Sequence, residues 1–269
     1  MKKLLIITVM LMSGAVAVTA QGVIDEQQKV FFRNERTFAV LLSTDGYDLN
    51  YREARRINYL NKRLLEADIG TLKHPKEYRV NNPYAQTAGS FIFGKLNSVM
   101  YLRGGIGHQH ELFSKADRGG VAIRYFYSGG PVLSLYKPIY YKVLYPVFTS
   151  QYLYEIREEK FEETIHTPID IYSRASFTRG LKEIKALPGI YAKGGLNFEY
   201  SKQDKVIHAI EIGPQINAFP KKIPIMASPD NKAIFFSLFV SYRMGVIVDP
   251  LHPEETRLKN LFRRKKMLL

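Results

Sequence analysis

The chain has 269 residues and a formal net charge of +14, with 18 Tyr, 16 Phe, no Trp and no Cys. The absence of cysteine excludes disulfides, thiolate catalysis, Cys-ligated metals and a lipid-modified N-terminal cysteine. The excess of positive charge favours anionic partners, such as lipid phosphates or an acidic protein surface.

The N-terminal residues have the layout of a secretory signal peptide. Lys2 and Lys3 form a positive segment, a mainly apolar run extends from Leu4 to Val18, and Val18 and Ala20 supply the small residues of a cleavage site. No other segment approaches the roughly 18 apolar residues that a membrane-spanning helix needs. We therefore expect an exported protein cleaved near Ala20, and export argues against nucleic acid as a partner.

Seven later segments alternate between two kinds of side chain with a period of two, which indicates strands. They cover residues 38–52, 62–74, 96–110, 120–130, 189–201, 206–218 and 233–247. An eighth strand is expected within 132–145, where Pro131 and Pro138 interrupt the pattern. Most of these runs reach the length of about 9–11 residues that a tilted membrane-spanning strand requires.

The two faces of these strands differ in character. Along 233–247, apolar side chains at every second position alternate with a set that includes Ser237, Ser241 and Arg243. In the other segments this second set carries both signs of charge: Glu66, Asp68, Arg103, Arg124, Lys193, Glu199 and Glu211. Such residues can pair inside a narrow barrel, so we expect a lumen filled by side chains.

The connections alternate between short polar turns and long links. Short turns are expected at 57–61, 114–120 and 201–205, and long links at 75–95, 146–186 and 219–232. Bacterial barrels have an even number of strands and show the same alternation of turns and loops. The sequence therefore predicts an all-β fold: an antiparallel up-and-down transmembrane β-barrel of about eight strands.

The sequence predicts a chain of four parts: a signal peptide (1–20), an N-terminal periplasmic segment (21–36), the barrel (37–248) and a basic tail (249–269). The long loop at 147–186 belongs to the barrel and could include a short helix. The tail is interpreted as a solvated chain end, or as a contact with anionic lipid or an acidic partner. A soluble periplasmic β-sandwich is the alternative fold.

His108 and His110 form the one compact group of candidate ligands or bases, on one face of a strand. They could hold a metal if a neighbouring strand supplied a third ligand, but the sequence nominates none. A Ser–His hydrolase would need a nucleophile from among Ser98, Ser128, Ser134, Ser237 and Ser241, and no G-x-S-x-G turn frames any of them. We expect no catalytic, cofactor-binding or metal-binding residues.

Four motifs resemble a family of uncharacterised outer-membrane β-barrels found in Bacteroidetes-type bacteria. They are KHPKE (73–77), GKLNS (94–98), GGVAIRYFY (119–127) and AFPKKIPIMA (218–227). The resemblance implies an outer-membrane location and transfers no catalytic residue. The basic extension after Val248 and the missing terminal aromatic residue depart from the usual barrel pattern. By association, the resemblance also points to an accessory role in type IX secretion.

We therefore expect a non-enzymatic docking or accessory subunit of the outer membrane, in contact with outer-membrane lipid or lipopolysaccharide and an envelope protein. A lipid-modifying barrel enzyme and a narrow channel are the alternatives. The lipid-modifying reading depends on a histidine and a serine meeting near the membrane boundary. The channel reading depends on an open lumen, which the charged inner face argues against.

Overall fold

The structure, a computed structural model, describes residues 34–84, 88–117, 119–146, 154–201 and 206–248. The expected signal peptide, most of the N-terminal segment 21–36 and the basic tail 249–269 lie outside this part of the chain. Within the described ranges, no helix combines the length and the apolar character needed to cross a membrane.

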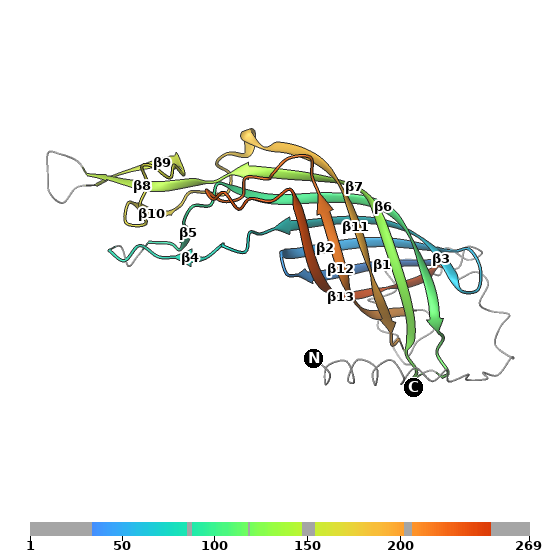
Figure 1. Cartoon of the computed structure of the whole chain (residues 1–269). Helices are drawn as coiled ribbons and strands as arrows, with labels where there is room; N and C mark the ends of the chain where they lie inside the picture. Colours follow the sequence, from blue (N-terminus) through green and yellow to red (C-terminus); the bar gives the residue numbers. More distant parts are fainter. Residues whose placement is uncertain (1–33, 85–87, 118, 147–153, 202–205, 249–269) are drawn as a thin grey trace, which may run out of the picture. The chain divides into compact units, whose positions relative to one another are not determined.

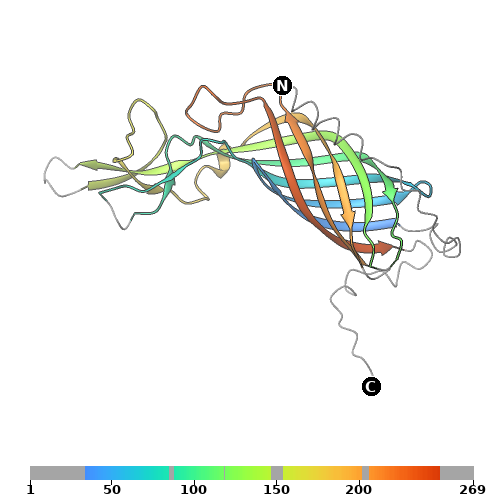
Figure 2. The ribbon, with the colours of Figure 1, turned by 60° about the horizontal axis from the view of Figure 1, so that its bottom comes forward.

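Eight antiparallel strands form a closed barrel (Figure 1, Figure 2). They are β1 (Asn34–Ser43), β2 (Gly46–Arg56), β3 (Asn61–Leu72), β6 (Asn97–Phe113), β7 (Ala122–Pro138), β11 (Lys185–Glu199), β12 (Val206–Ala218) and β13 (Ile234–Val248). Their order around the barrel is β1-β13-β12-β11-β7-β6-β3-β2, and pairing of β1 with β13 closes the ring. The predicted all-β, eight-stranded antiparallel barrel is confirmed.

The alternation in the sequence assigns each side chain to the correct side of the barrel wall. In β13, Phe236 is 67% exposed whereas its neighbour Phe235 is 6% exposed. In β11, Ile190 is 68% exposed and Tyr191 is 4% exposed. Successive side chains of a strand point to opposite faces, so one face of every strand lines the lumen.

Two predicted strand boundaries are wrong, and the two errors cancel in the count. The segment predicted as one strand at 38–52 is two strands, β1 and β2, joined at Thr44 and Asp45. An Asp-Gly pair is a strong hairpin signal, and Asp45-Gly46 marks the turn that the predicted single strand does not take into account. A Cβ atom on Gly46 would lie 2.0 Å from the carbonyl oxygen of Thr71, so this tight approach needs glycine.

The second error divided one long strand into two. The segment 120–130 and the first half of 132–145 belong to one strand, β7, which ends at Pro138; the second half of 132–145 lies in β8 (Tyr140–Pro146). Pro131 lies where the β6–β7 pairing is interrupted, between the Arg103–Val132 and Ile106–Gly129 pairs, and it opposes Ile190 on β11. Proline has no N–H to donate and is tolerated in a sheet at such an irregularity.

The two ends of the barrel carry different connections. At the end where β1 begins and β13 finishes, the links are short and span residues 57–60, 114–121 and 200–205. At the opposite end, the β1–β2 turn is short but the other links span 73–96, 139–184 and 219–233. We call these the termini end and the loop end.

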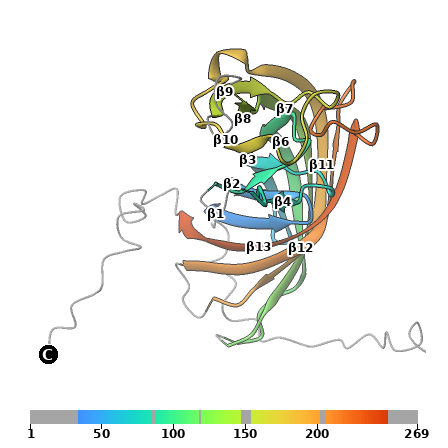
Figure 3. The ribbon, with the colours of Figure 1, turned by 90° about the vertical axis from the view of Figure 1, so that its left-hand side faces the viewer.

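The long links fold into small sheets at the loop end. The strands β4 (Arg79–Val80) and β5 (Phe91–Ile92) pair, and a second sheet has the order β10-β8-β9, with β9 at Tyr154–Lys160 and β10 at Ile171–Arg174. We call these sheets, together with the 3₁₀ helix η2 (Leu181–Glu183), the extension. Figure 3 shows β8, β9 and β10 grouped together. The region predicted as a long loop at 147–186 is thus largely ordered strand and turn among its described residues.

Candidate functional surfaces: an apolar wall, a filled lumen and a folded extension

The outer wall of the barrel is covered with exposed apolar side chains. On β13 alone, Phe236, Leu238 and Val240 are between 50% and 67% exposed. Strands β1, β3, β6 and β12 contribute Phe38, Val40, Leu42, Leu65, Ile69, Leu102, Ile106, Ile210 and Ile212. An apolar surface on all sides of a barrel is typical of contact with lipid, because water would penalise it.

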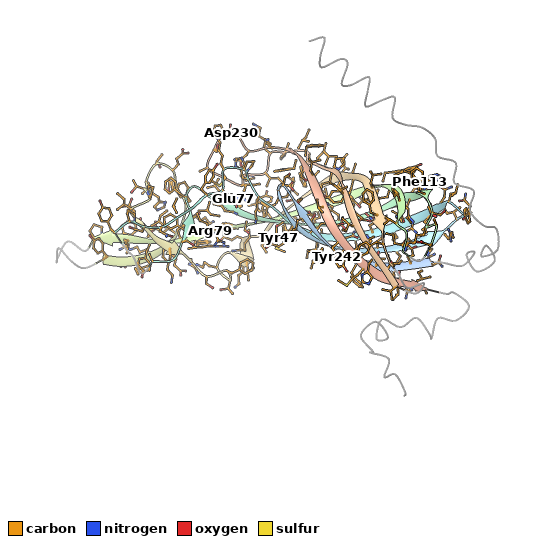
Figure 4. The ribbon with its side chains drawn as sticks, turned by 90° about the horizontal axis from the view of Figure 1, so that it is seen from below. Tyr47, Glu77, Arg79, Phe113, Asp230 and Tyr242 are labelled. Carbon is orange, nitrogen blue, oxygen red and sulfur yellow. The ribbon has the colours of Figure 1, made fainter. Side chains whose placement is uncertain are left out.

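Near the termini end, tyrosine and histidine rings interleave on this wall. His208 lies between Tyr200 and Tyr242, with ring centroids 6.2 Å apart on both sides. Its Nδ1 is 2.8 Å from the Tyr242 hydroxyl. Figure 4 shows Tyr242 on the barrel wall and Phe113 toward the termini end. Amphipathic rings at the edge of an apolar belt are typical of a membrane–water interface.

His108 and His110 belong to the same wall. Their rings lie 5.8 Å and 5.2 Å from those of Tyr127 and Tyr125, and His110 Nδ1 is 2.7 Å from Asn61 Oδ1. Among the described residues, no group of His, Asp and Glu is arranged to hold a metal ion.

Four of the five candidate serines lie on the other side of the wall. Ser128, Ser134, Ser237 and Ser241 are buried in the lumen. Ser128 donates to Glu66 (2.8 Å) and Ser241 to Glu211 (3.2 Å), and the β-sheet separates all four from His108 and His110. Ser98 is half-buried at the loop-end start of β6, ten residues before His108 on the same strand, which corresponds to a distance of about 33 Å.

The lumen contains a network of buried ion pairs. Glu211 on β12 accepts hydrogen bonds from Arg52 (2.6 Å) and Arg243 (2.9 Å). Asn197 and Ser241 also donate to it, at 2.8 Å and 3.2 Å. We call Arg52, Glu66, Asp68, Arg103, Lys193, Glu211 and Arg243 the lumen network. Its charges come from facing strands, so the network fixes the barrel wall across its interior.

Several contacts of the lumen network cross the barrel. Arg52 on β2 reaches both Glu66 on β3 and Glu211 on β12. Lys193 on β11 lies 3.0 Å from Glu66 and 3.3 Å from Asp68. Since β2 and β12, and likewise β11 and β3, are not neighbours in the sheet, these bonds span the lumen. The interior is therefore occupied where an open pore would need free space.

The loop end of the lumen is covered by apolar side chains from the β12–β13 link. Phe219, Ile223, Ile225 and Met226 are at most 7% exposed. They pack on lumen-facing residues of the strands: Leu72, Val99, Tyr101, Val132, Tyr191 and Phe235. We call residues 219–226 the plug.

Asn231 holds the plug in place. Its Oδ1 accepts hydrogen bonds from the backbone N–H groups of Ile225 (3.0 Å) and Met226 (3.1 Å). Its Nδ2 donates to the carbonyl groups of Met226 (2.7 Å) and Ser228 (2.9 Å). One side chain thus satisfies four backbone groups and replaces regular secondary structure in this link.

The extension has a core of its own. Phe91, Ile139, Tyr141, Val143, Phe161 and Ile171 are buried together. The Tyr141 hydroxyl donates to the carbonyl oxygens of Ile92 (2.6 Å) and Lys95 (2.8 Å), and burial raises the pKa of this hydroxyl. This bond links β8 to the segment that precedes β6. The extension is therefore a folded element with defined surfaces.

Strand β9 is the exposed edge of the extension. It pairs with β8 on one side only, within the described part of the chain. Tyr154 is 58% exposed and Ile156 is 50% exposed, among acidic and basic neighbours. An exposed edge strand presents unpaired backbone groups to which another chain can add.

The sequence predicts the lumen-facing charges correctly, but neither the plug nor the core of the extension. A signal for the plug was present, since Ile223, Ile225 and Met226 are apolar residues inside a link rich in lysine and proline. For the extension, the alternation of Ile139, Tyr141 and Val143 was also visible.

The sequence matches no family model and no curated protein. Among solved structures, Neisserial surface protein A has 10% identity and a TM-score of 0.36, with 80% of this chain and 96% of that chain covered. Ail, the attachment invasion locus protein of Yersinia pestis, has 8% identity and a TM-score of 0.33, with 80% and 97% covered. The fold assignment rests on the strand pairing of this chain, and the resemblance of the four motifs stays a prediction.

Proposed function

We propose that the protein is an outer-membrane β-barrel whose extension serves as a docking element, making it a non-enzymatic accessory subunit. The observation that supports the membrane location is the apolar outer wall around a charged, internally paired lumen. This arrangement is inverted relative to a soluble protein, in which the charged side chains face water.

The docking role is supported by the extension. A closed barrel of this size has little room for a ligand in its lumen, so recognition falls to the surfaces outside the wall. The extension has a buried core and an exposed edge strand, β9, with apolar side chains between charged ones. We therefore propose that the binding partner is an envelope protein, one strand of which pairs with the free edge of β9.

A narrower proposal is an accessory role in type IX secretion. Its support is the resemblance of the four sequence motifs. The two alternatives are less well supported by the geometry. A lipid-modifying pair of His108 or His110 with a serine would have to cross the barrel wall or, with Ser98, span most of the length of β6. A channel would have to pass both the lumen network and the plug.

The docking proposal can be tested with two matched variants of the full chain. Ile156 on β9 and Ile169 in the β9–β10 link are both 50% exposed. We expect a pull-down from detergent-solubilised outer membranes to recover a partner with the wild type and with Ile169→Lys, and to lose it with Ile156→Lys. Recovery of the protein alone from wild-type membranes, or equal recovery with both variants, would contradict the proposal.

A further inference from the structure

An open pocket lies at the loop end, between the residues that follow β3 and the β12–β13 link. Its volume is about 730 Å³, which falls within the roughly 300–1,000 Å³ of small-molecule sites. His74, Lys76, Lys222, Asp230 and Lys232 line it. Figure 4 marks its position by Asp230.

The pocket carries an excess of positive charge. Lys76 pairs with Asp230, which is the acidic residue of the lining. Lys222 and Lys232 have no ion-pair partner within the described ranges, and both are exposed. Two ammonium groups on one concave surface, without a carboxylate to neutralise them, favour a doubly charged anion.

The buried imidazole of His74 lines the same pocket. His74 is 5% exposed, and its Nδ1 accepts a hydrogen bond from the backbone N–H of Lys76 at 3.1 Å. The proton of the neutral ring is then on Nε2. No described residue accepts a hydrogen bond from Nε2. A buried donor without a partner costs free energy, and an anionic ligand would supply the acceptor.

The pocket lies at the boundary of the apolar wall. Ile234, which also lines it, is the first residue of β13 and is 56% exposed. Two positions later, Phe236 begins the fully apolar part of this strand. In a barrel placed in a bilayer, lysines at this level lie beside the lipid headgroups.

We propose that this pocket binds a phosphate monoester, carried by the headgroup of a lipid at the loop end of the barrel. Lys222 and Lys232 neutralise the phosphate, and the Nε2–H of His74 donates to one of its oxygens. The assignment of the phosphate to a lipid headgroup rests on the proposed membrane location. The binding of a phosphate monoester in the pocket does not depend on the proposed docking role.

Native mass spectrometry of the folded full chain in detergent tests this, with dilauroylphosphatidic acid, dilauroylphosphatidylcholine and inorganic phosphate as probes. We expect a one-to-one complex with phosphatidic acid and much weaker binding of phosphatidylcholine. The variant Lys222→Gln/Lys232→Gln should weaken phosphatidic acid binding by about tenfold or more, for the loss of two charge-assisted contacts. The control Lys182→Gln/Lys185→Gln removes two exposed lysines outside the pocket and should leave binding unchanged.

Equal binding of both lipids, or full binding by the Lys222/Lys232 variant, would overturn the proposal. If inorganic phosphate displaces phosphatidic acid, the site is supported and the phosphate alone is the recognised group. If binding depends on Lys222 and Lys232 but inorganic phosphate does not displace the lipid, the site is supported and the lipid is required for recognition. If the protein binds phosphatidic acid but is found in the soluble fraction, the phosphate site stands and only the membrane location is refuted.

Discussion

Glu211 is the residue on which the lumen network depends most. Its carboxylate pairs with both Arg52 and Arg243, and its side chain is 1% exposed. Replacing one partner of a buried ion pair leaves the other charge unpaired in a low-dielectric interior. Arg52 retains its hydrogen bond to Glu66 in that case, whereas the remaining hydrogen-bond partners of Arg243 among the described residues, Thr37 and Asn50, are neutral.

We predict that Glu211→Leu lowers the free energy of unfolding by about 3–5 kcal/mol, because it leaves Arg243 without a carboxylate. Urea unfolding of the protein folded in lipid vesicles measures this change. Glu155→Gln is the control, since Glu155 pairs with Arg157 in an exposed position, where solvent screens the interaction and its loss should have little effect. Equal effects of the two substitutions would contradict the role given to the lumen network.

Asn231 gives a second prediction at this scale. Asn231→Ala removes three hydrogen bonds to the plug and one to Ser228, so the backbone amides of Ile225 and Met226 should exchange with solvent faster. Hydrogen–deuterium exchange of the folded protein measures it. Asn58→Ala is the matched control, because Asn58 caps a turn at the termini end by accepting from Leu60 and Asn61. Unchanged protection of the plug in Asn231→Ala would show that packing alone holds it.

At the scale of the element, the β1–β2 hairpin depends on close approach of backbone at Gly46. A Cβ atom there would meet the Thr71 carbonyl, whereas a Cβ atom on Gly104 would meet nothing within 4 Å. We predict that Gly46→Ala reduces the yield of folded barrel and that Gly104→Ala does not. The fraction that migrates as the folded form on an unboiled gel measures the yield. Equal yields would mean that the hairpin can shift at no cost.

The elements also show how far the sequence predicts this fold. Period two decides which side chains face the lumen, so Arg103, Lys193 and Glu211 could be placed without coordinates. Strand boundaries are harder to predict, because the turn at Thr44 and Asp45 is only two residues long. Local patterns hint at the extension and the plug, but their packing could not be predicted, since their cores form between residues far apart in sequence, such as Phe91 and Ile171.

The same limit applies to the candidate site. His74 is more than a hundred residues away from Lys222 and Lys232, and no spacing in the sequence brings it to them. The closed barrel does so, because the links after β3 and β12 emerge at the same end. The histidines that the sequence did single out, His108 and His110, are on the outer wall among tyrosine rings.

At the scale of the whole molecule, the filled lumen predicts that the barrel does not conduct ions. Lysine and arginine side chains reach carboxylates on non-adjacent strands, and the plug covers the loop end. We expect the full chain to show no stable conductance steps in planar bilayers. Reproducible single-channel steps would contradict the account of the lumen and revive the channel hypothesis.

The central claim is that the chain forms a closed barrel in the outer membrane. Membrane fractionation followed by comparison of boiled and unboiled samples on a gel tests it most directly. We predict a protein in the outer-membrane fraction that migrates faster unboiled, because a closed barrel resists unfolding by detergent at room temperature. A protein in the soluble periplasmic fraction with no shift in mobility would contradict the claim.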